Sequence, residues 1–363
     1  QAMAVWSGTS MAPIFAGRSQ HGFEFSATEM SHFGGGGGAR TYADGVDTAG
    51  IVFNTTPNMP NIEDQEAEYP VLYLFRRHLR DSGGPGLYRG GRSAELAYMV
   101  YDAPDGKLEG LFAGTGAEMP NAIGVSGGMP GAAIRIARVI GTGLNERVQR
   151  MLPLPDSLLN VPGRIEILAS KHERTPIGAG DVWYHSWQAG GGYGDPLRRD
   201  PNRAAEDIAR GIVSIEAARA IYGVAVRSDN TVDVAETEAL RASHRRSRLA
   251  KSQEPRAGDA VMRFAGQGTA RFGTALNLDL TEGAIRCSHC GSTLGSPGQD
   301  ILPKLREWMA PLTAAGPVRG EDYDQGRFHL RHVLCPDCGS AIDVHVAHEG
   351  APWPSANVII HST

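Results

Sequence analysis

The sequence has few cysteines, no long apolar run and no excess of positive charge. Its 363 residues include four cysteines, and 40 acidic residues outnumber 35 Lys and Arg, giving a formal net charge of −5. This balance argues against nucleic acid or an anionic membrane as a partner. No stretch approaches the roughly 20 apolar residues that span a bilayer, and residues 1–6 lack the basic start of a signal peptide. We therefore expect a cytoplasmic protein without a membrane segment, since so few cysteines fit a reducing compartment.

Glycine is abundant, with 47 residues or nearly twice the average usage of roughly 7%. The glycines follow no fixed period and cluster between short apolar runs. Four of these runs have the length and the β-branched or aromatic content of strands. They are residues 71–75, 94–101, 133–140 and 164–168. We therefore expect an α+β fold that is rich in β-structure and has long glycine-rich loops.

Helical patterns begin only after residue 200. The expected helices are residues 201–210, 215–222 and 234–251. Asp200 before Pro201 is typical of a helix start, and Gly211 is typical of a helix end. Residues 241–251 are dense in Arg and His, which indicates either a solvated helix end that complements the helix dipole or a contact with a polyanion.

The pattern divides the chain into three parts. Residues 1–226 form a glycine-rich region, residues 227–259 a helix and linker, and residues 260–363 a compact tail that holds all four cysteines. We expect the tail to be a separate zinc-binding domain.

Two short motifs of the form Cys-x-x-Cys-Gly carry the four cysteines. Cys287 and Cys290 belong to the first motif, and Cys335 and Cys338 belong to the second. Two residues between paired cysteines let both thiolates point at one ion, and the following glycine permits the positive φ of such a turn. Two such pairs are typical of a closed, tetrahedral structural site. We therefore predict that these four residues bind a structural Zn²⁺ ion.

Two other interpretations of these motifs stay open, namely redox-active pairs and an iron centre. A redox pair would open a helix, and neither motif precedes a helical pattern. His289, inside the first motif, could replace a cysteine as a ligand. Strand-like residues 328–333 and 341–346 around the second motif favour a zinc ribbon, and the insert between the motifs has room for a helix over residues 301–309.

Two glycine motifs match parts of known functional loops without the expected context. Residues 124–128 read Gly-x-Ser-x-Gly, but the following Met-Pro-Gly cannot begin the helix that a nucleophilic serine needs, so we expect a turn. Residues 34–38 are five glycines that could cradle a phosphate, yet no Lys-Ser/Thr follows, which favours a loop near an active site, either flexible or tightly packed. The remaining candidates are scattered histidines, His21, His32, His78, His172 and His185. We assign no catalytic or cofactor-binding residue.

A series of short segments before residue 226 occurs in a characteristic order. They are residues 34–40, 44–45, 60–70, 81–86, 88–91, 180–181, 190–197 and 214–219. Together they resemble the hydantoinase B family, which includes 5-oxoprolinase halves and the large subunits of acetone and acetophenone carboxylases. The resemblance covers the carboxyl half of such a subunit. Nothing here matches the preceding half, which holds catalytic metal ligands in the carboxylases.

The tail from about residue 256 is similar to the small zinc-binding subunit of the same carboxylases. The resemblance implies a part of an ATP-dependent ketone carboxylase complex, which joins bicarbonate and a ketone such as acetophenone to give a β-keto acid. It also implies a hydantoinase-A-like partner that binds ATP, and a separate amino-half hydantoinase-B-like polypeptide if that half is not encoded with this chain. ATP and a catalytic divalent metal are then expected on partner subunits of a hetero-oligomer, and the chain alone is expected to be inactive.

Two alternative functions remain open. The first is a subunit of an ATP-dependent amidohydrolase of the hydantoinase, oxoprolinase or lactamase type, and the second is a non-catalytic module that uses the zinc ribbon as its contact surface. The zinc tail favours the carboxylase over the amidohydrolase.

Overall fold

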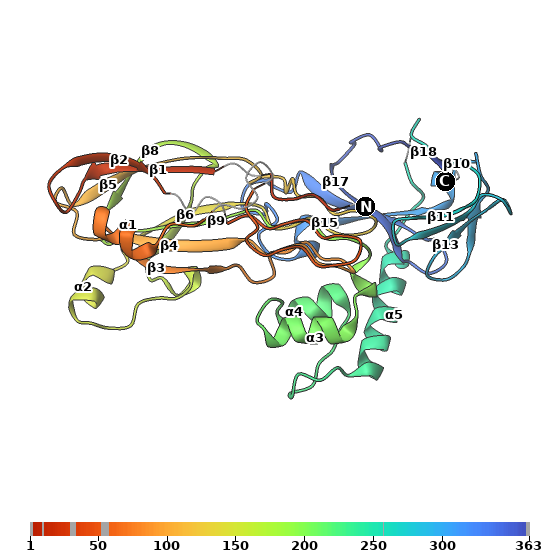
Figure 1. Cartoon of the computed structure of the whole chain (residues 1–363), viewed down its shortest axis with the longest axis horizontal. Helices are drawn as coiled ribbons and strands as arrows, with labels where there is room; N and C mark the ends of the chain where they lie inside the picture. Colours follow the sequence, from red (N-terminus) through yellow and green to blue (C-terminus); the bar gives the residue numbers. More distant parts are fainter. Residues whose placement is uncertain (1–2, 9–10, 30–33, 52–57, 257, 361–363) are drawn as a thin grey trace.

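Two antiparallel sheets form one end of an elongated molecule (Figure 1). The computed structural model describes residues 1–363 except 1–2, 9–10, 30–33, 52–57, 257 and 361–363. The first sheet has the order β2-β1-β5-β8, and its strands are β1 (Met11–Arg18), β2 (Glu24–Thr28), β5 (Lys107–Gly114) and β8 (Lys171–Gly178). The second has the order β3-β4-β9-β6-β7, and its strands are β3 (Val71–His78), β4 (Ala94–Val100), β6 (Arg135–Ile140), β7 (Arg164–Ile167) and β9 (Val182–Ser186). Side chains of both sheets, among them Phe112 and Trp183, share one core, so the sheets form a sandwich.

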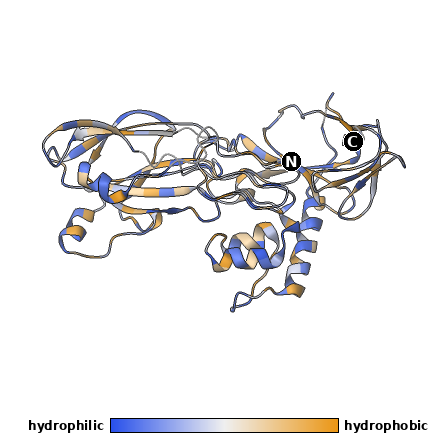
Figure 2. Cartoon of the chain, viewed as in Figure 1, coloured by the Kyte–Doolittle hydropathy of each residue, from blue (hydrophilic) through white to orange (hydrophobic). Residues whose placement is uncertain are grey.

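The central strands of the second sheet are buried on both faces. The outer face of this sheet packs against α2 (Leu144–Gln149) and the short turn η1 (Leu158–Asn160), which contribute Leu144 and Leu158 to a second core. Every residue of β4 is therefore buried, and in Figure 2 this strand is largely hydrophobic. The strands expected from the sequence are confirmed as β3, β4, β6 and β7. Helix α1 (Ile62–Glu68), which Asn61 caps, precedes β3.

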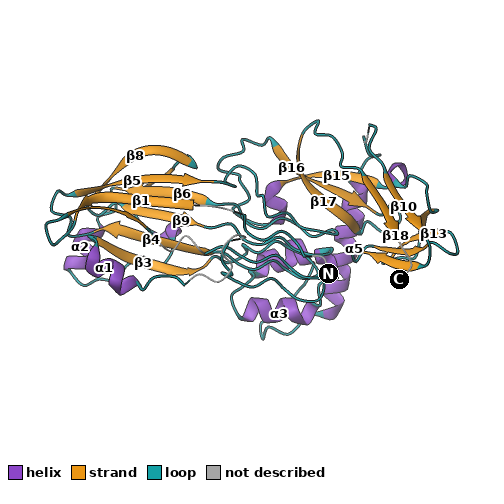
Figure 3. Cartoon of the chain, turned by 45° about the horizontal axis from the view of Figure 1, so that its top comes forward, coloured by secondary structure: helices purple, strands orange, loops and turns teal. Residues whose placement is uncertain are grey.

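Long glycine-rich loops connect the sandwich to the other end of the molecule and run side by side (Figure 3). Neighbouring loops bond to one another through their backbones, as in the bonds from Gly190 N to Gly91 O (3.0 Å) and from Gly91 N to Gly37 O (2.8 Å). A Cβ atom at Gly190 would lie 1.9 Å from Gly37 O, and one at Gly38 would lie 1.9 Å from Ala4 O. None of these four glycines has a positive φ. Their role is therefore to let backbones approach closely rather than to permit a left-handed turn.

The helical segments from Pro196 to Ala250 lie together on one side of the molecule, whereas α1 and α2 lie at the sandwich end (Figure 1). The segments on this side are η2 (Pro196–Arg198), α3 (Pro201–Ala209), α4 (Ile215–Ala217), the π-helical turn η3 (Ala218–Tyr222) and α5 (Val234–Ala250). Asp200 caps α3 through Asn202 N (2.9 Å), and Gly211 follows it with φ +65°, so both predicted boundaries are confirmed. Much of α5 is hydrophilic (Figure 2). No helix among the described residues is long and apolar enough to cross a membrane.

Three small sheets form the opposite end of the molecule. The first pairs β10 (Met262–Gly266) with β18 (Ala356–Ile360). The second consists of β11 (Thr269–Phe272), β12 (Leu276–Asp279), β13 (Ala284–Cys287) and β14 (Thr293–Gly295). The third consists of β15 (Arg306–Pro311), β16 (Phe328–Leu334) and β17 (Ala341–His348). The expected strands on both sides of the second cysteine motif are confirmed as β16 and β17. The strand-rich α+β class with a terminal cysteine-bearing β-module is confirmed as well.

The helix expected over residues 301–309 is wrong. That segment forms a short 3₁₀ turn, η4 (Leu302–Lys304), followed by β15, which pairs with β16 along six residues. Ile301, Leu302 and Leu305 of this segment lie in the core of the tail. Pairing with a strand that follows later in the chain therefore overrides local periodicity here.

The tail is packed closely against the first region. Met129, from a glycine-rich loop, belongs to the same apolar cluster as Leu312, Leu330 and Leu334. The 3₁₀ turn η5 (Leu312–Ala315), which follows β15, contributes Leu312 and Ala315 to this cluster. The division at residues 226 and 259 stays a prediction.

Candidate metal centre

The four cysteines come together at one point, although they belong to two different sheets. Cys287 ends β13, and Cys335 directly follows β16. The Cys287 and Cys338 sulfurs are 3.8 Å apart, those of Cys290 and Cys335 are 3.7 Å apart, and all four lie within 4.8 Å of one another. A tetrahedral ion with Zn–S bonds of about 2.3 Å places its sulfurs about 3.8 Å apart. The four sulfurs could therefore hold a metal ion, with a geometry compatible with structural zinc.

Both cysteine motifs have the same backbone conformation. In the first, Cys287 N donates to Ser292 O (2.9 Å) and Gly291 N donates to Cys287 O (2.9 Å). The second repeats both bonds at Cys335, from Cys335 N to the residue five positions later and from Gly339 N to Cys335 O. Gly291 and Gly339 have φ of +80° and +68°, as expected for the glycine that closes each turn. Each motif therefore forms a knuckle that presents two sulfurs on the same side.

A serine supports the outer cysteine of each knuckle, a feature that the sequence analysis did not find. The Ser292 hydroxyl lies 3.1 Å from the Cys290 sulfur, and the Ser340 hydroxyl lies 3.4 Å from the Cys338 sulfur. Both motifs read Cys-x-x-Cys-Gly-Ser, so the repetition of this serine was the available signal. A hydroxyl that donates to a thiolate orients that ligand.

Without a cation, the four neighbouring thiols cannot all be ionised at the same time. Hydrogen bonds from Cys335 and then Cys338 lower the pKa of the Cys287 thiol to about 3. The same contacts, first with Cys287 and then with Cys338, raise the pKa of the Cys335 thiol far above its usual range. One thiolate therefore suppresses ionisation of the next. A divalent cation would remove this conflict, and the donor set suits zinc.

His289 stands apart from this cluster. It is exposed within the first knuckle, and the metal-binding group among the described residues consists of the four cysteines. Burial, followed by nearby Arg245, lowers the pKa of His289. The four cysteine sulfurs can therefore supply all the ligands of a tetrahedral site without His289.

A buried ion pair connects the second knuckle to the glycine-rich region and to α5. The Asp195 carboxylate is 1% exposed and accepts hydrogen bonds from Leu197 N (3.0 Å), Ala341 N (2.8 Å) and Arg248 (2.9 Å). Arg248 also donates to Gly339 O (3.4 Å), the glycine that closes the knuckle. Burial opposes ionisation of Asp195, but Arg248 and the amide donors lower its pKa. This junction joins three parts of the chain at one carboxylate.

Several cations at the basic end of α5 bind other parts of the protein, so the expectation of a solvated helix end is wrong for them, whereas the contact with a polyanion stays a prediction. Arg241 donates to the backbone oxygens of Tyr222 (3.2 Å) and Arg199, and a ring nitrogen of His244 lies 2.9 Å from Arg219 O. Arg248 is buried against Asp195, whereas Arg246 is exposed. The cationic face of α5 therefore binds the ends of preceding helices, whose carbonyls attract cations.

A sequence model described as Hydantoinase B/oxoprolinase matches residues 1–196, which is more than half of the chain. The chain belongs to this family. The delta subunit of acetophenone carboxylase from Aromatoleum aromaticum is 31% identical over 258 residues, which cover 67% of this chain and 37% of that protein. The chain thus spans about a third of the length of the relatives it matches.

Two solved structures of family relatives are similar to this one. Nucleotide-free acetone carboxylase has a TM-score of 0.61 and 31% identity, and the match covers 67% of this chain and 34% of that chain. The ATP-dependent caprolactamase from Pseudomonas jessenii has a TM-score of 0.52 and 26% identity, with 66% and 38% covered. Membership of the hydantoinase B/oxoprolinase family is consistent with the segments from which the resemblance was recognised.

Charged residues of the glycine-rich loops and of the region around α3 form a buried ion network. Arg89 contacts Asp47 (3.0 Å) and Asp207 (3.3 Å), and Arg199 contacts Asp44 (2.8 Å) and Asp207 (2.6 Å). Burial raises the pKa of Asp44, but Arg199 and Arg89 outweigh that effect and lower it. These ion pairs attach two glycine-rich loops to α3. Their arrangement indicates a structural role rather than a catalytic one.

The two glycine motifs with possible functional readings are also structural. Gly36 N donates to Gln188 O (3.1 Å) and Gly37 N donates to Val46 O (2.9 Å), so these amides are not available for a phosphate. Ser126 lies in a turn with φ +58° and accepts a hydrogen bond from Thr274 N (2.9 Å). The expected turn at residues 124–128 is confirmed, and no helix follows it.

The scattered histidines do not form a cluster. His21 and His78 are exposed, His172 is half-buried and His185 is fully buried, packed against the Trp187 ring at 4.6 Å. His32 lies outside the described residues. The described histidines therefore join no group of three or more potential metal ligands with the other described residues.

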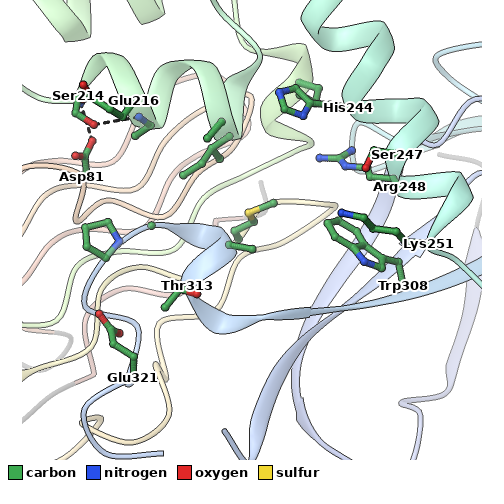
Figure 4. A pocket seen from close by; sticks show the side chains of 18 residues that line it. Asp81, Ser214, Glu216, His244, Ser247, Arg248, Lys251, Trp308, Thr313 and Glu321 are labelled. Atoms are coloured by element: carbon green, nitrogen blue, oxygen red, sulfur yellow. Dashed lines mark hydrogen bonds between the residues drawn. The ribbon is translucent and has the colours of Figure 1, made fainter.

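A cavity of about 640 Å³ lies beside the junction, between α4, α5 and β15 (Figure 4). Lys251 and Arg248 lie on one side, and Asp81 and Glu321 lie on the other. Arg248 is paired with Asp195, Asp81 accepts from Ser214 N (2.7 Å), and Lys251 lies 5.9 Å above the Trp308 ring. Most charges of this cavity therefore already have partners within the protein.

Proposed function

We propose that this chain is part of a subunit of an ATP-dependent ketone carboxylase complex, to which it contributes scaffold and a structural zinc domain. The reaction would join bicarbonate and a ketone, an aromatic one such as acetophenone included, to give a β-keto acid. ATP and a catalytic divalent metal would be held by partner subunits, one of them hydantoinase-A-like. The chain alone would be inactive.

One observation carries this proposal, namely the attachment of a four-cysteine β-module to a hydantoinase-B-like region. The similarity to acetone carboxylase supports it, because the TM-score of 0.61 and the identity of 31% exceed the values of 0.52 and 26% for the caprolactamase. The acetophenone carboxylase subunit matches over 67% of the chain, which reaches beyond the 196 residues of the family match.

The described residues of this chain have structural tasks in the proposed complex. Cys287, Cys290, Cys335 and Cys338 would hold Zn²⁺, which would fix the two knuckles against each other. The glycine-rich loops pack backbone against backbone without room for side chains, which suits the wall of a chamber that protects a reactive carboxylating intermediate from hydrolysis.

An ATP-dependent amidohydrolase is the second candidate. The structural similarity to the caprolactamase, which covers 66% of this chain, favours it specifically. A complex of this type would hydrolyse a cyclic amide and would not need bicarbonate.

Purification of the tagged chain from its native host would test the proposal, with mass spectrometry of the proteins that co-purify. We expect a hydantoinase-A-like partner, one zinc per chain and, if it is a separate polypeptide, an amino-half hydantoinase-B-like protein. The complex is then assayed for ATP hydrolysis with a ketone, with bicarbonate, with both, and with a cyclic amide.

Hydrolysis that needs both ketone and bicarbonate is the expected result. Hydrolysis that needs a cyclic amide alone would replace the carboxylase with the amidohydrolase. A zinc-loaded chain that purifies without such partners would instead support a zinc-ribbon binding module.

A further inference from the structure

A second cavity, of about 730 Å³, lies where the tail meets the glycine-rich region. It is bounded by the β11–β12 hairpin of the tail and by loops that carry Tyr88, Ser126 and Tyr193, and we call it the hairpin cavity. Its volume is within the usual range of roughly 300–1,000 Å³ for small-molecule sites. The proposed function above assigns no role to this cavity.

One part of the hairpin cavity is apolar and aromatic. Tyr88 and Tyr193 pair through their backbones in an isolated bridge, and both residues line the cavity together with Leu87 and Val125. Tyr193 is only 4% exposed, and burial raises the pKa of its phenol. An aromatic or other apolar group would be removed from water here, and aromatic rings pack favourably at edge or offset contacts.

The polar part of the cavity favours an anion. Arg271 and Asn277 are direct partners in the β11–β12 pairing, so their side chains lie on the same face of the hairpin. Both are exposed, and no described residue forms a hydrogen bond or ion pair with the Arg271 side chain. Arg198 is a second cation in the lining, and Asp343, its single acid, lies 3.6 Å from His345.

The first zinc knuckle forms part of the wall. The Ser288 hydroxyl, inside that knuckle, donates to Thr274 O (2.5 Å) and accepts from Arg198 (3.0 Å). Thr274 lies in the turn between β11 and β12 and also donates its N–H to the Ser126 hydroxyl. The knuckle therefore holds the turn of the hairpin against the glycine-rich loops. Because Arg271 lies close to that turn, its position is fixed as well.

We propose that the hairpin cavity binds an organic carboxylate with an apolar, preferably aromatic, body. The carboxylate contacts Arg271 and Asn277, and the body packs against Tyr88 and Tyr193. Arg271 suits this role because a guanidinium can donate two parallel hydrogen bonds to a carboxylate. A β-keto acid is one compound of this class, and that identification rests on the proposed function, whereas the binding itself does not.

Isothermal titration of the zinc-loaded full chain with 3-phenylpropionate tests the proposal without ATP, ketone or partner. We expect saturable binding at one site. The neutral 3-phenylpropanol and the small anion acetate should each bind at least about tenfold more weakly, because each lacks one of the two interactions.

Variants assign the binding to this cavity. Arg271→Met should weaken phenylpropionate binding about tenfold or more, and Arg271→Lys should restore part of it. Arg263→Met is the matched control, since Arg263 is an exposed arginine on β10 of the same tail and should leave affinity unchanged. Zinc content and melting temperature confirm that each variant is folded.

Equal affinity of Arg271→Met and the parent chain would overturn the proposal, as would equal affinity for phenylpropanol or no saturable binding at all. Loss of binding in Lys251→Met instead of Arg271→Met would move the site to the cavity beside α5. If binding is seen but the purified complex lacks ketone-dependent ATP hydrolysis, the proposed function fails and the ligand site stands.

Discussion

At the scale of single residues, several glycines of the long loops are needed because neighbouring backbones approach too closely for a side chain, not because the chain turns there. A Cβ atom at Gly190 would lie 1.9 Å from Gly37 O and 2.3 Å from its carbonyl carbon. Because the obstacle is backbone, no side-chain rotation relieves it. Gly190→Ala should therefore lower the free energy of unfolding by about 3 kcal/mol or more, which thermal or denaturant unfolding would measure.

Gly8→Ala is the control for this prediction. A Cβ atom at Gly8 would come no closer than 3.8 Å to the Asn121 side chain, and its φ is not positive. This change should alter stability by less than about 1 kcal/mol. Equal effects of the two substitutions would show that the loops can move apart.

The His332 side chain should make the stability of the protein depend on pH. It is fully buried and stacks on Trp308 with 4.5 Å between ring centroids. Burial, and then nearby Arg248, lowers its pKa to about 3. Since the unfolded chain has a His pKa of about 6.5, it binds a proton between about pH 6.5 and 3 that the folded protein does not. This contribution to stability is therefore present above about pH 6.5 and is lost as the pH falls.

Melting temperatures between pH 7 and 5 would measure this effect in His332→Phe, which keeps an aromatic ring against Trp308. The variant should lose stability less steeply than the parent, by at most about 1.4 kcal/mol per pH unit. His348→Phe, at an exposed histidine, should keep the parent slope. Zinc content is followed in parallel, and equal slopes at equal zinc content would contradict the prediction.

At the scale of elements, the sequence predicts those whose boundaries depend on local chemistry. The start of α3 follows from Asp200 and Pro201, and the ends of the helical segments follow from glycines such as Gly223, which has φ +60°. The segment over residues 301–309 could not be predicted in the same way, because its strand pairing is with residues that lie beyond a long loop. Local spacing contains no information about that partner.

The loop between β15 and β16 should stabilise the whole fold through one arginine. Arg319 is fully buried and donates to Pro130 O (3.1 Å), Asp81 O (3.2 Å) and Pro317 O (2.5 Å), two of which belong to the glycine-rich region. It forms no ion pair with a described carboxylate, and burial lowers its pKa to about 10. Arg319→Met keeps the volume but leaves these carbonyls without a donor, which should cost about 3 kcal/mol in unfolding.

A matched substitution in the same loop separates this effect from a general sensitivity of the loop. Arg327 is 60% exposed at its side chain and pairs with Glu118. Because exposed ion pairs contribute little, Arg327→Met should cost less than about 1 kcal/mol. A similar loss of stability in both variants would remove the special role of Arg319.

At the scale of the whole molecule, the candidate metal ligands could be predicted from sequence, whereas their connection to the rest of the protein could not. Each knuckle is local, so the spacing of Cys287, Cys290, Cys335 and Cys338 carries the signal. The junction instead joins Asp195 to Arg248 and to Ala341, which follow it by 53 and 146 residues. Only the fold brings these residues together. It also places Arg248, from the basic end of α5, in the junction, which the sequence alone does not indicate.

This connection predicts the order in which a damaged zinc site should fail. Cys335→Ser removes one of four ligands, so zinc content should fall well below one per chain. The second knuckle also supplies Gly339 O to Arg248 and Ala341 N to Asp195, so its loosening should free α5 and the junction. Metal analysis, hydrogen exchange of α5 and co-purification of partners should therefore change before any chemical step in the complexes that remain.

His289→Ala is the control, because it changes the same site without removing a sulfur, and it should keep both zinc and partners. An intact complex with normal metal content in Cys335→Ser would contradict this order of events. Loss of zinc with α5 and the partners unaffected would be equally informative, since it would show that Asp195 and Arg248 hold the junction without help from the knuckle. The structure favours failure of both together, because the same short turn supplies a metal ligand and the backbone groups that the ion pair binds.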